Sequence, residues 1–433
     1  MRKALTLVTG LALALGATTA TWAGTAAATD RAHGRSSRGS RSSGAIVVDW
    51  NEELLRIVRT PGAQPATVHP TRNFAILQAA IYDAVDSITH DAPPYLFTVR
   101  AAEDARPDAA AATAGHDTLV GLYPAMKPEL DQLFTTELAA LPDGAEKQRG
   151  VQVGALTSEL MLAIRAHDGS DAMPPPLPPA TQPGQFRPTP PNFASAVFTH
   201  WNVVTPFVLN DAEQFRPVPP PPLSSDAYAA ALNEVKSLGQ DSSTTRTADQ
   251  TTQAKFWAAP IWNYWNQIAD DAVLARHSDL LQSARLFADL DLSFADGAIA
   301  FYDAKYNYDL WRPITAIREA ATDGNPATIA DPNWTALAAT PADPSYPGAH
   351  SVISEAGATV LSAFFGNHHD IAVTSEVLPG VVRHFDGYQD AAIEAGQSRI
   401  FAGVHTRLDH NAGVSLGQNV AADVLAENDM GPR

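Results

Sequence analysis

Three short clusters in the last third of the chain combine cationic, histidine and carboxylate side chains at close spacing. Lys305 is followed by Arg312, a loop over 344–350 ends in His350, and a third cluster covers 398–409. Together they provide three cations, two histidines and a glycine-containing turn that presents backbone N–H groups. Several convergent donors of this kind suit an oxyanion such as phosphate or vanadate. The sequence therefore predicts an oxyanion-binding site.

Lys305 and Arg312 lie seven residues apart in a segment predicted to be helical, so both side chains are expected on one face of the helix. Pro313 is expected to kink or end this helix and to turn that face toward a pocket. A solvated basic stripe is the alternative interpretation. Burial is favoured because the segment is unusually aromatic, and buried cations need anionic partners. Its aromatic residues are Phe301, Tyr302, Tyr306, Tyr308 and Trp311.

The second cluster is a tight loop that leads into a helix expected over 348–365. The N-terminus of a helix presents free N–H groups and the positive end of the helix dipole, so Gly348 and Ala349 are candidate oxyanion-binding residues. His350 lies in the first turn and is a candidate acid or base near neutral pH. A capping or core histidine is the alternative for His350.

In the third cluster, Arg399 is expected near the end of one helix, and His405 follows Gly403. His405 and Asp409 are four residues apart, so the carboxylate can accept from one ring nitrogen and leave the other free as a nucleophile or ligand. A purely structural pair is the alternative. A conventional metalloprotease-type site is not indicated, because the chain has no HExxH motif.

The amino-acid composition limits the classes of partner that the protein can be expected to bind. The 433 residues carry a formal net charge of −18, which argues against nucleic acid or an anionic membrane as a main partner and makes a local cluster of cations more informative. Hydrophobic residues make up 45% and charged residues 18%, an ordinary globular balance. There is no cysteine, so stability must come from packing and bound ligands rather than disulfides.

The N-terminus has the pattern of a secretory signal peptide over residues 1–28: Arg2 and Lys3, an apolar stretch, and then small residues. Cleavage is expected after Ala28, with Ala23 nearly as plausible, and a membrane anchor is the alternative. Residues 29–44 are rich in Ser, Arg and Gly and are predicted to be a disordered leader. We therefore expect a soluble, secreted (extracellular) mature protein without a membrane span.

From residue 45 to residue 433 the pattern predicts a single large all-α domain built of helical bundles, with the oxyanion site within 300–410. Two proline-rich stretches, 174–191 and 217–222, are expected to be surface loops. The predicted helices cover about 47–58, 74–85, 105–122, 127–140, 144–167, 226–238, 243–271, 280–319, 348–365, 385–404 and 409–427.

Read in order, the clusters are K-x6-RP, P-x-Y-P-x-x-H and SR-x3-G-x-H-x3-D. This combination resembles the vanadium-dependent haloperoxidase and type 2 phosphatidic acid phosphatase superfamily. Upstream segments that begin at Trp50, Ala75, His200 and Gln214 extend the resemblance over most of the mature chain. They are similar to secreted, bacterial haloperoxidase-type members. The resemblance implies the all-α helical-bundle fold of these proteins.

The resemblance also implies roles for the site residues. His405 would be the apical vanadium ligand or, in a phosphatase, the nucleophile that forms a phosphohistidine. Asp409 would orient His405, and His350 would be the acid–base. The residues that would bind vanadate or phosphate are Lys305, Arg312, Gly348, Ala349 and Arg399.

The implied cofactor is vanadate, with phosphate able to occupy the same site, and no haem is expected. The implied partners are hydrogen peroxide with a halide or a small organic substrate, or a phosphomonoester. Neither the halide nor the oligomeric state can be read from the sequence.

Two positions depart from the family's pattern. The loop reads Pro347-Gly348-Ala349-His350 where the family usually has Pro-Ser-Gly-His, so a serine hydroxyl that would bind the oxyanion is missing. A hydrogen bond to a charged group contributes roughly 1.5–3 kcal/mol, which corresponds to about tenfold or more in affinity. Asp343 stands where halide-oxidising relatives tend to carry an aromatic residue or a histidine. A carboxylate near the path of a halide would repel it.

Three functions are compatible with these residues. The first is a vanadate-dependent haloperoxidase that oxidises halide, bromide rather than chloride, with hydrogen peroxide. The second is a soluble acid phosphatase (phosphomonoesterase) that works through a phosphohistidine at His405. The third is an exported oxyanion-binding protein without catalysis. The His350 and His405 pair favours an enzyme, since binding alone would need only the cations.

Overall fold

The structure is a computed structural model that describes residues 42–64 and 68–430. The predicted signal peptide and residues 29–41 of the predicted leader lie outside the described residues. The described helices all belong to one unit, Ser42–Arg433. Their packing against one another is what positions the site.

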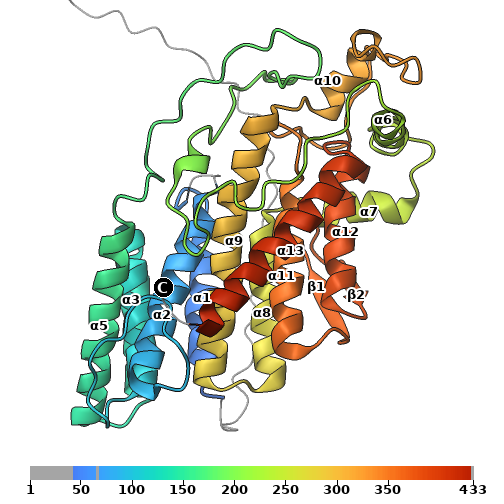
Figure 1. Ribbon diagram of the computed structural model, residues 1–433. Coiled ribbons are helices and arrows are strands. Elements are labelled where there is room, and N and C mark those ends of the chain that lie inside the picture. The colour runs from blue at the N-terminus through green and yellow to red at the C-terminus, as the bar shows by residue number, and fades with distance from the viewer. Residues whose placement is uncertain (1–41, 65–67, 431–433) are drawn as a thin grey trace, which may run out of the picture. The chain divides into compact units, whose positions relative to one another are not determined.

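The described residues are mostly helical (Figure 1), which confirms the all-α prediction. Both proline-rich stretches lie outside the α-helices. Strand is limited in the described ranges to one antiparallel pair, in which Ile371 is opposite Phe385. The elements are α1 Ala45–Arg59, α2 His69–Thr89, α3 Pro107–Leu122, η1 Pro124–Met126, α4 Lys127–Ala139, α5 Ala145–Arg165, η2 Trp201–Val203, α6 Asp226–Leu238, α7 Ala248–Phe256, α8 Ile261–Arg276, α9 Leu280–Tyr308, α10 Pro313–Arg318, η3 Ala320–Thr322, α11 Ala349–Phe365, β1 Ile371–Thr374, β2 Val382–Phe385, α12 Tyr388–Phe401 and α13 Arg407–Met430.

The long helix α9 forms the centre of the packing (Figure 1). Asp279 caps its N-terminus by accepting a hydrogen bond from the N–H of Gln282 at 2.8 Å. Buried residues occupy all sides of α9, as expected of a helix that is surrounded by others. It packs against α2 on the N-terminal side of the chain and against α11 and α13 on the C-terminal side. Helices α11, α12 and α13 pack together. The N-terminal end of α11 and the C-terminal end of α12 contribute residues to the wall of the site.

Lys305 and Arg312 do not share a helix, in contrast to the prediction of one helix over 280–319. The α-helix ends at Tyr308, because Asp309 adopts a left-handed conformation (φ 48°) and its N–H closes the last turn on the carbonyl of Lys305. Arg312 is extended (φ −78°, ψ 154°), as expected of a residue that precedes proline, and it is the N-cap of α10. The two side chains nevertheless reach the same cavity from different segments.

The helix predicted over 243–271 is also divided. Helix α7 ends at Phe256, and α8 begins at Ile261 after Pro260, whose ring fixes φ and prevents a continuous helix. At this break the carbonyl of Pro260 accepts from the N–H of Asn263, and the carbonyl of Trp257 lies 3.0 Å from Nε2 of His350. Among the described residues, no helix combines the length and the apolar character needed to cross a bilayer.

Candidate active site

A cavity of about 620 Å³ collects side chains from segments that are far apart in the sequence. Its wall includes residues of α8, α9, α11 and α12, the loop that precedes α11 and the loop that follows α12. The fold therefore brings side chains of all three sequence clusters to one cavity, while their roles there stay predictions. The predicted site residues on the wall are Lys305, Arg312, Ala349, His350, Arg399 and His405.

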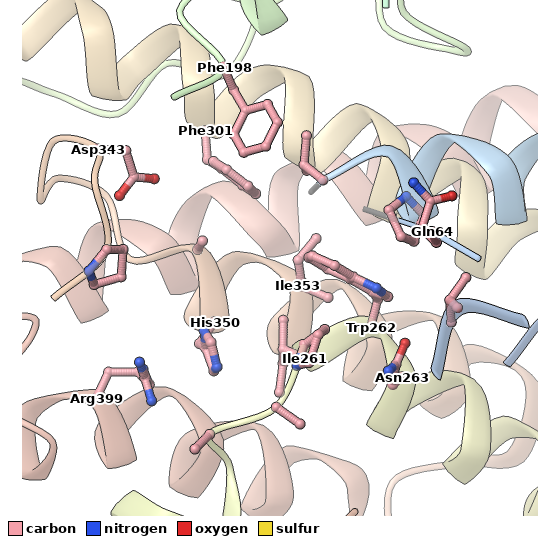
Figure 2. A pocket seen from close by; sticks show the side chains of 18 of the residues that line it. Gln64, Phe198, Ile261, Trp262, Asn263, Phe301, Asp343, His350, Ile353 and Arg399 are labelled. Atoms are coloured by element: carbon pink, nitrogen blue, oxygen red, sulfur yellow. The ribbon is translucent and has the colours of Figure 1, made fainter. Parts of the chain in front are cut away.

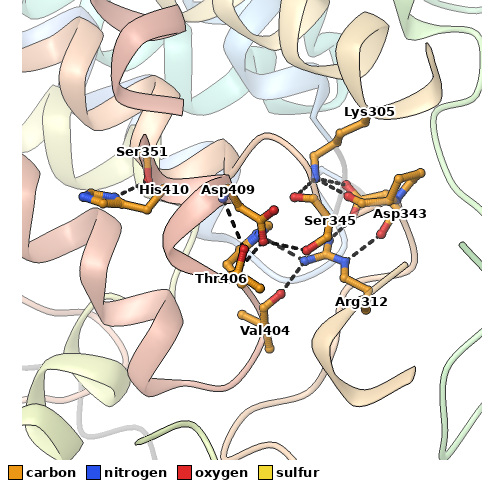
Figure 3. A network of polar contacts seen from close by, with 11 residues as sticks. Lys305, Arg312, Asp343, Ser345, Ser351, Val404, Thr406, Asp409 and His410 are labelled. Carbon is orange, nitrogen blue, oxygen red and sulfur yellow. Dashed lines mark hydrogen bonds and ion pairs between the residues drawn. The ribbon is translucent and has the colours of Figure 1, made fainter. Parts of the chain in front are cut away.

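Arg312 is buried and uses its whole guanidinium group. Nε donates to the carbonyl oxygen of Asp343 at 2.7 Å, and Nη2 forms an ion pair with the Asp343 carboxylate. Nη1 donates to the carbonyl of Val404 at 2.9 Å and lies 3.1 Å from Nε2 of His405. Figure 3 shows this network, in which Arg312 connects the loop before α11 to the loop after α12. Arg312 therefore fixes the two loops relative to each other.

Lys305 is fully buried on α9 and faces the same loop (Figure 3). Its ammonium group donates to the carbonyl of Pro344 and, at 3.4 Å, to that of Ser345. It also lies 3.8 Å from Oδ2 of Asp343. Burial is the main reason that the pKa of Lys305 falls to about 8, and Arg312 lowers it further while Asp343 opposes the shift. The amine is charged near neutral pH but titrates at alkaline pH.

Asp343 lines the cavity and lies between Lys305 and Arg312. The sequence had marked this residue only as a departure from the family's pattern. Burial disfavours its charged form, but Lys305 and Arg312 outweigh burial and hold the pKa of Asp343 below its usual value. The carboxylate is therefore ionised at neutral pH. It is a negative charge inside a cluster of positive ones.

His405 has a defined tautomer. A guanidinium only donates, so the contact from Arg312 makes Nε2 of His405 an acceptor. Nδ1 then carries the proton and donates to Oδ2 of Asp409 at 3.2 Å. Burial, followed by the charge of Arg312, lowers the pKa of His405 to about 3. At neutral pH the imidazole is neutral and presents the lone pair of Nε2 to the cavity, as a ligand or nucleophile must.

Asp409 does not line the cavity, but it holds His405 from behind. Its Oδ2 also accepts from Oγ of Ser345 at 2.7 Å and from the N–H of Thr406 at 2.7 Å. Burial opposes ionisation, yet the hydrogen bond from His405 and the other donors keep the pKa of Asp409 below its ordinary value. Oδ2 thus accepts three hydrogen bonds, which holds the carboxylate in place behind His405, as expected of a positioning residue.

His350 lies in the first turn of α11 with its ring on the cavity wall. Its Nε2 lies 3.0 Å from the carbonyl of Trp257 and must donate to it, which leaves Nδ1 as the acceptor. Burial, then the charge of Arg399, holds the pKa of His350 well below its usual value. Figure 2 shows His350 beside Arg399 at one end of the cavity. The neutral ring can accept a proton at Nδ1.

Arg399 provides the test of whether this cavity suits an oxyanion. Its side chain is buried on the cavity wall, and Nε and Nη1 find no hydrogen-bond partner among the described residues. A buried guanidinium with unsatisfied donors is costly, so the arrangement calls for an anionic acceptor. Burial and then Arg312 lower the pKa of Arg399 to about 10, so it remains a cation at neutral pH. These donors fit vanadate or phosphate.

The turn between Arg399 and His405 depends on Gly403. Gly403 has φ 79°, and a Cβ atom at this position would lie 2.3 Å from the carbonyl oxygen of Gly239. Only glycine meets both conditions without strain. After the turn, the N–H groups of Val404 and His405 donate to the carbonyl of Arg399 at 3.1 and 3.3 Å. The backbone thereby lets both Arg399 and His405 reach the cavity wall.

The loop before α11 differs from expectation at Gly348. Gly348 is the N-cap of the helix, but it is not on the cavity wall, and its N–H donates to the carbonyl of Asp409 at 2.9 Å. That N–H is therefore engaged in holding α11 to the start of α13. Ala349 is on the wall, and its N–H belongs to the first turn, where helices leave donors without intrahelical partners.

The cavity also has an apolar part that the sequence did not reveal. Phe301 and Tyr302 lie on α9 within the aromatic segment noted in the sequence, whereas Phe198, Trp262 and Ile353 come from other segments. Figure 2 shows apolar and aromatic side chains facing the cavity on the side away from Arg399. Apart from the aromatic run next to Lys305, no local signal identifies these residues, because tertiary packing brings them together.

Comparisons with known proteins relate this chain to a family by sequence and by fold. The family model described as the VCPO second helical-bundle domain matches residues 285–430, the region that contains the site residues. A vanadium chloroperoxidase from Curvularia inaequalis is 26% identical in an alignment of 261 positions, and the match covers 44% of this chain and 42% of the relative. The alignment thus spans less than half the length of that relative.

Solved structures share the fold. A bacterial vanadium-dependent iodoperoxidase has a TM-score of 0.75 at 24% identity and covers 88% of this chain and 95% of that chain. A holo-type bacterial vanadium-dependent chloroperoxidase has a TM-score of 0.67 at 16% identity, with coverages of 85% and 94%. At identities of 24% and 16%, the likeness to these solved structures concerns the fold. The relationship in sequence is shown by the family model that matches residues 285–430. Residues 285–430 thus match the second helical-bundle domain of the vanadium chloroperoxidase family, and the described chain shares the fold of bacterial vanadium-dependent haloperoxidases.

Proposed function

We propose that this protein is a vanadate-dependent haloperoxidase that uses hydrogen peroxide to oxidise a halide, bromide in preference to chloride. One observation carries the proposal. Arg399, whose Nε and Nη1 have no partner among the described residues, lines one cavity with Lys305, Arg312 and His405, and the lone pair at Nε2 of His405 accepts from Arg312. A neutral imidazole acceptor among buried cations suits a ligand that is both an oxyanion and a Lewis acid.

Each residue has a task that follows from its geometry. Lys305, Arg312 and Arg399 would donate to the oxygens of a bound oxyanion and offset its charge, with Arg312 giving up its contact to Nε2 of His405. Nε2 of His405 would be the direct ligand, held in place through Nδ1 by Asp409. Bound vanadate would supply the Lewis acidity that activates hydrogen peroxide for oxygen transfer to the halide.

His350 is the proposed acid–base residue. Its Nε2–H is fixed by the carbonyl of Trp257, so Nδ1 is the atom that takes a proton from incoming peroxide and returns it later. Because burial and Arg399 keep the ring neutral, it is ready to act as a base at neutral pH.

The preference for bromide is supported by the weak electron-withdrawing character of this cage. The serine hydroxyl usual in the family is absent at Gly348, and the Asp343 carboxylate offsets part of the positive charge. A less electron-withdrawing cage favours a halide that is easily oxidised, and bromide is easier to oxidise than chloride. The relatives named above include chloroperoxidases and an iodoperoxidase, so their names support halide oxidation without a common halide.

We also propose that the mature protein is exported, since residues 1–28 carry the basic, apolar and small-residue pattern of a signal peptide. Expression of the full chain in a bacterial host, followed by N-terminal sequencing of secreted protein, tests this. A mature N-terminus at Thr29, or at Gly24 after the alternative cleavage, is expected. Intact Met1 in the cytoplasmic fraction would contradict export.

The function itself is tested by a paired assay. Purified protein is loaded with orthovanadate, and bromination of a diketone is followed with hydrogen peroxide; the vanadate-free protein is tested in parallel on an aryl phosphate. We expect vanadate-dependent bromination that is lost in His405→Ala and kept in His384→Ala, a variant at an exposed position on β2. Phosphate release without bromination would refute the proposal, as would saturable vanadate binding with neither activity.

A further inference from the structure

The carboxylate of Asp343 occupies the region where an oxyanion would meet Arg312 and Lys305. It is 6% exposed, lines the cavity, forms an ion pair with Nη2 of Arg312 and lies 3.8 Å from Nζ of Lys305. Figure 3 shows Lys305 and Arg312 both directed at this residue. In contrast, the donors Nε and Nη1 of Arg399 have no acceptor in the described part of the chain. Two of the three cations in the cage are therefore already paired.

This pairing is not needed to hold the loop in place. The main chain of the same loop is anchored independently, because Nε of Arg312 donates to the carbonyl of Asp343 and Nζ of Lys305 donates to the carbonyls of Pro344 and Ser345. The side-chain carboxylate is an additional contact. A buried charge that adds little anchoring and faces a ligand cavity is better explained by an effect on the ligand.

We propose that Asp343 is a specificity-determining residue that acts as an internal anion: it competes with the bound oxyanion for Arg312 and Lys305 and so disfavours oxyanions of higher charge. The proposal rests on the oxyanion site of the proposed function, but not on halide oxidation. An incoming anion first meets the free donors of Arg399 and then has to weaken the ion pair of Asp343. Repulsion from the carboxylate grows with the charge of the ligand, so a dianion is disfavoured more than a monoanion.

The other charged groups around the cavity do not replace Asp343 in this role. The carboxylate of Asp409 is committed to His405, Ser345 and Thr406, on the far side of the imidazole. The Tyr302 hydroxyl adjoins Asp343, and burial, reinforced by that carboxylate, raises its pKa, so it stays neutral. Glu376 also lines the cavity, but it pairs with Arg59 at 2.5 Å, so Asp343 is the described wall carboxylate that contacts Arg312.

The test compares two tetrahedral ions of similar shape and different charge, molybdate (a dianion) and perrhenate (a monoanion), neither of which requires turnover. Their affinities are measured by titration calorimetry at pH 7.5 for the full chain and for Asp343→Asn, which keeps the shape and removes the charge. We expect Asp343→Asn to bind molybdate at least about tenfold more tightly, with a clearly smaller gain for perrhenate. The control is Asp303→Asn. Asp303 lies on the same helix as Lys305, but its carboxylate pairs with Arg216 outside the cavity.

Unchanged or weaker molybdate binding in Asp343→Asn would overturn the proposal, because the carboxylate would then support the cage rather than compete. Equal gains for both ions would also overturn it, since charge selection would be absent. Thermal unfolding with and without molybdate checks that the variant is folded, and the stabilisation by molybdate should be larger in Asp343→Asn than in the parent. Asp343→Glu, which retains the charge, should keep the low molybdate affinity. If Asp343→Asn gives the expected gains in anion binding but the parent protein does not brominate, the proposed function is refuted while the role of Asp343 stands.

Discussion

Nη1 of Arg312 donates a hydrogen bond to Nε2 of His405 across 3.1 Å. The contact assigns the ring tautomer, because a guanidinium cannot accept, and it directs the lone pair of His405 toward the cations. The same guanidinium also binds the carbonyls of Asp343 and Val404, so it fixes the imidazole and both loops around it. Binding of an oxyanion at Nε2 would require Arg312 to turn its donor from the ring to the ligand.

Arg312→Lys tests this arrangement. Lysine keeps the charge but lacks the planar guanidinium with its several N–H donors. It therefore cannot donate at the same time to the carbonyls of both loops, to the His405 ring and to a ligand. Loss of hydrogen bonds to charged groups at roughly 1.5–3 kcal/mol each predicts at least about tenfold weaker orthovanadate binding. Bromination at saturating vanadate should fall as well. Arg318→Lys, on α10 and bonded to the carbonyl of Trp334, should bind vanadate like the parent; equal losses in both variants would contradict the assignment.

Much of the fold and the convergence of the clusters could be predicted from the sequence. Helical periodicity is a local signal, so the helices that end in glycine- or proline-containing turns, such as α6 and α11, agree closely with prediction. The joint presence of Lys305, Arg399 and His405 predicted a common cavity because an oxyanion needs several convergent donors. That argument depends on residue chemistry, and the structure places all three on one wall.

The parts that could not be predicted depend on tertiary contacts. Arg312 was expected on the helix of Lys305, but Asp309 ends that helix in a left-handed conformation that few non-glycine residues adopt, and nothing nearby indicates it. The N–H of Gly348 was a candidate donor to the oxyanion, but it bonds to Asp409, sixty-one residues later in the chain. The ion pair of Asp343 with Arg312 likewise joins segments whose contact no local pattern encodes.

Lys305 predicts a pH dependence of anion binding. Burial lowers its pKa to about 8 in the anion-free protein, and an anion favours the charged amine. Affinity should therefore be highest below pH 8 and should fall as the pH rises through this value. Perrhenate is a suitable probe because it stays a monoanion over this range. Lys305→Arg, which remains charged, should show a flat profile from pH 7 to pH 9; a decline equal to that of the parent would exclude Lys305 as its source.

Asp409→Asn tests the positioning of His405. The amide preserves the shape but can no longer stabilise the Nδ1–H tautomer as a carboxylate does, and the lone pair at Nε2 is no longer enforced. Changes in such supporting partners typically cost about 10–100-fold in affinity or activity, and we expect a loss of that size in vanadate binding. Nitrogen NMR of the imidazole should show a shift toward the Nε2–H tautomer. Asp423→Asn on the same helix, whose carboxylate accepts from Gln214, is the control. An unaltered tautomer would rule out the positioning role.

Arg399 and Arg165 provide a contrast between a guanidinium reserved for a ligand and one that serves the fold. Arg165 is buried with its donors satisfied by Asp168, Thr205 and Pro206, and it stacks 3.7 Å from the ring centre of Phe207. Its replacement by methionine should lower the free energy of unfolding by about 3 kcal/mol, since the carbonyls of Thr205 and Pro206 lose a charged donor while Asp168 keeps Arg72.

Arg399→Met should behave in the opposite way. It removes a buried cation whose Nε and Nη1 have no acceptor among the described residues, so the anion-free protein should unfold within about 1 kcal/mol of the parent or be more stable. Molybdate or vanadate binding should weaken by at least about tenfold, because each lost hydrogen bond to the anion contributes roughly 1.5–3 kcal/mol. Urea unfolding without added anion, combined with calorimetric binding, measures both effects. If Arg399→Met were destabilised as strongly as Arg165→Met, the guanidinium of Arg399 would be a structural group, and the cage would lose the cation on which the proposed function rests.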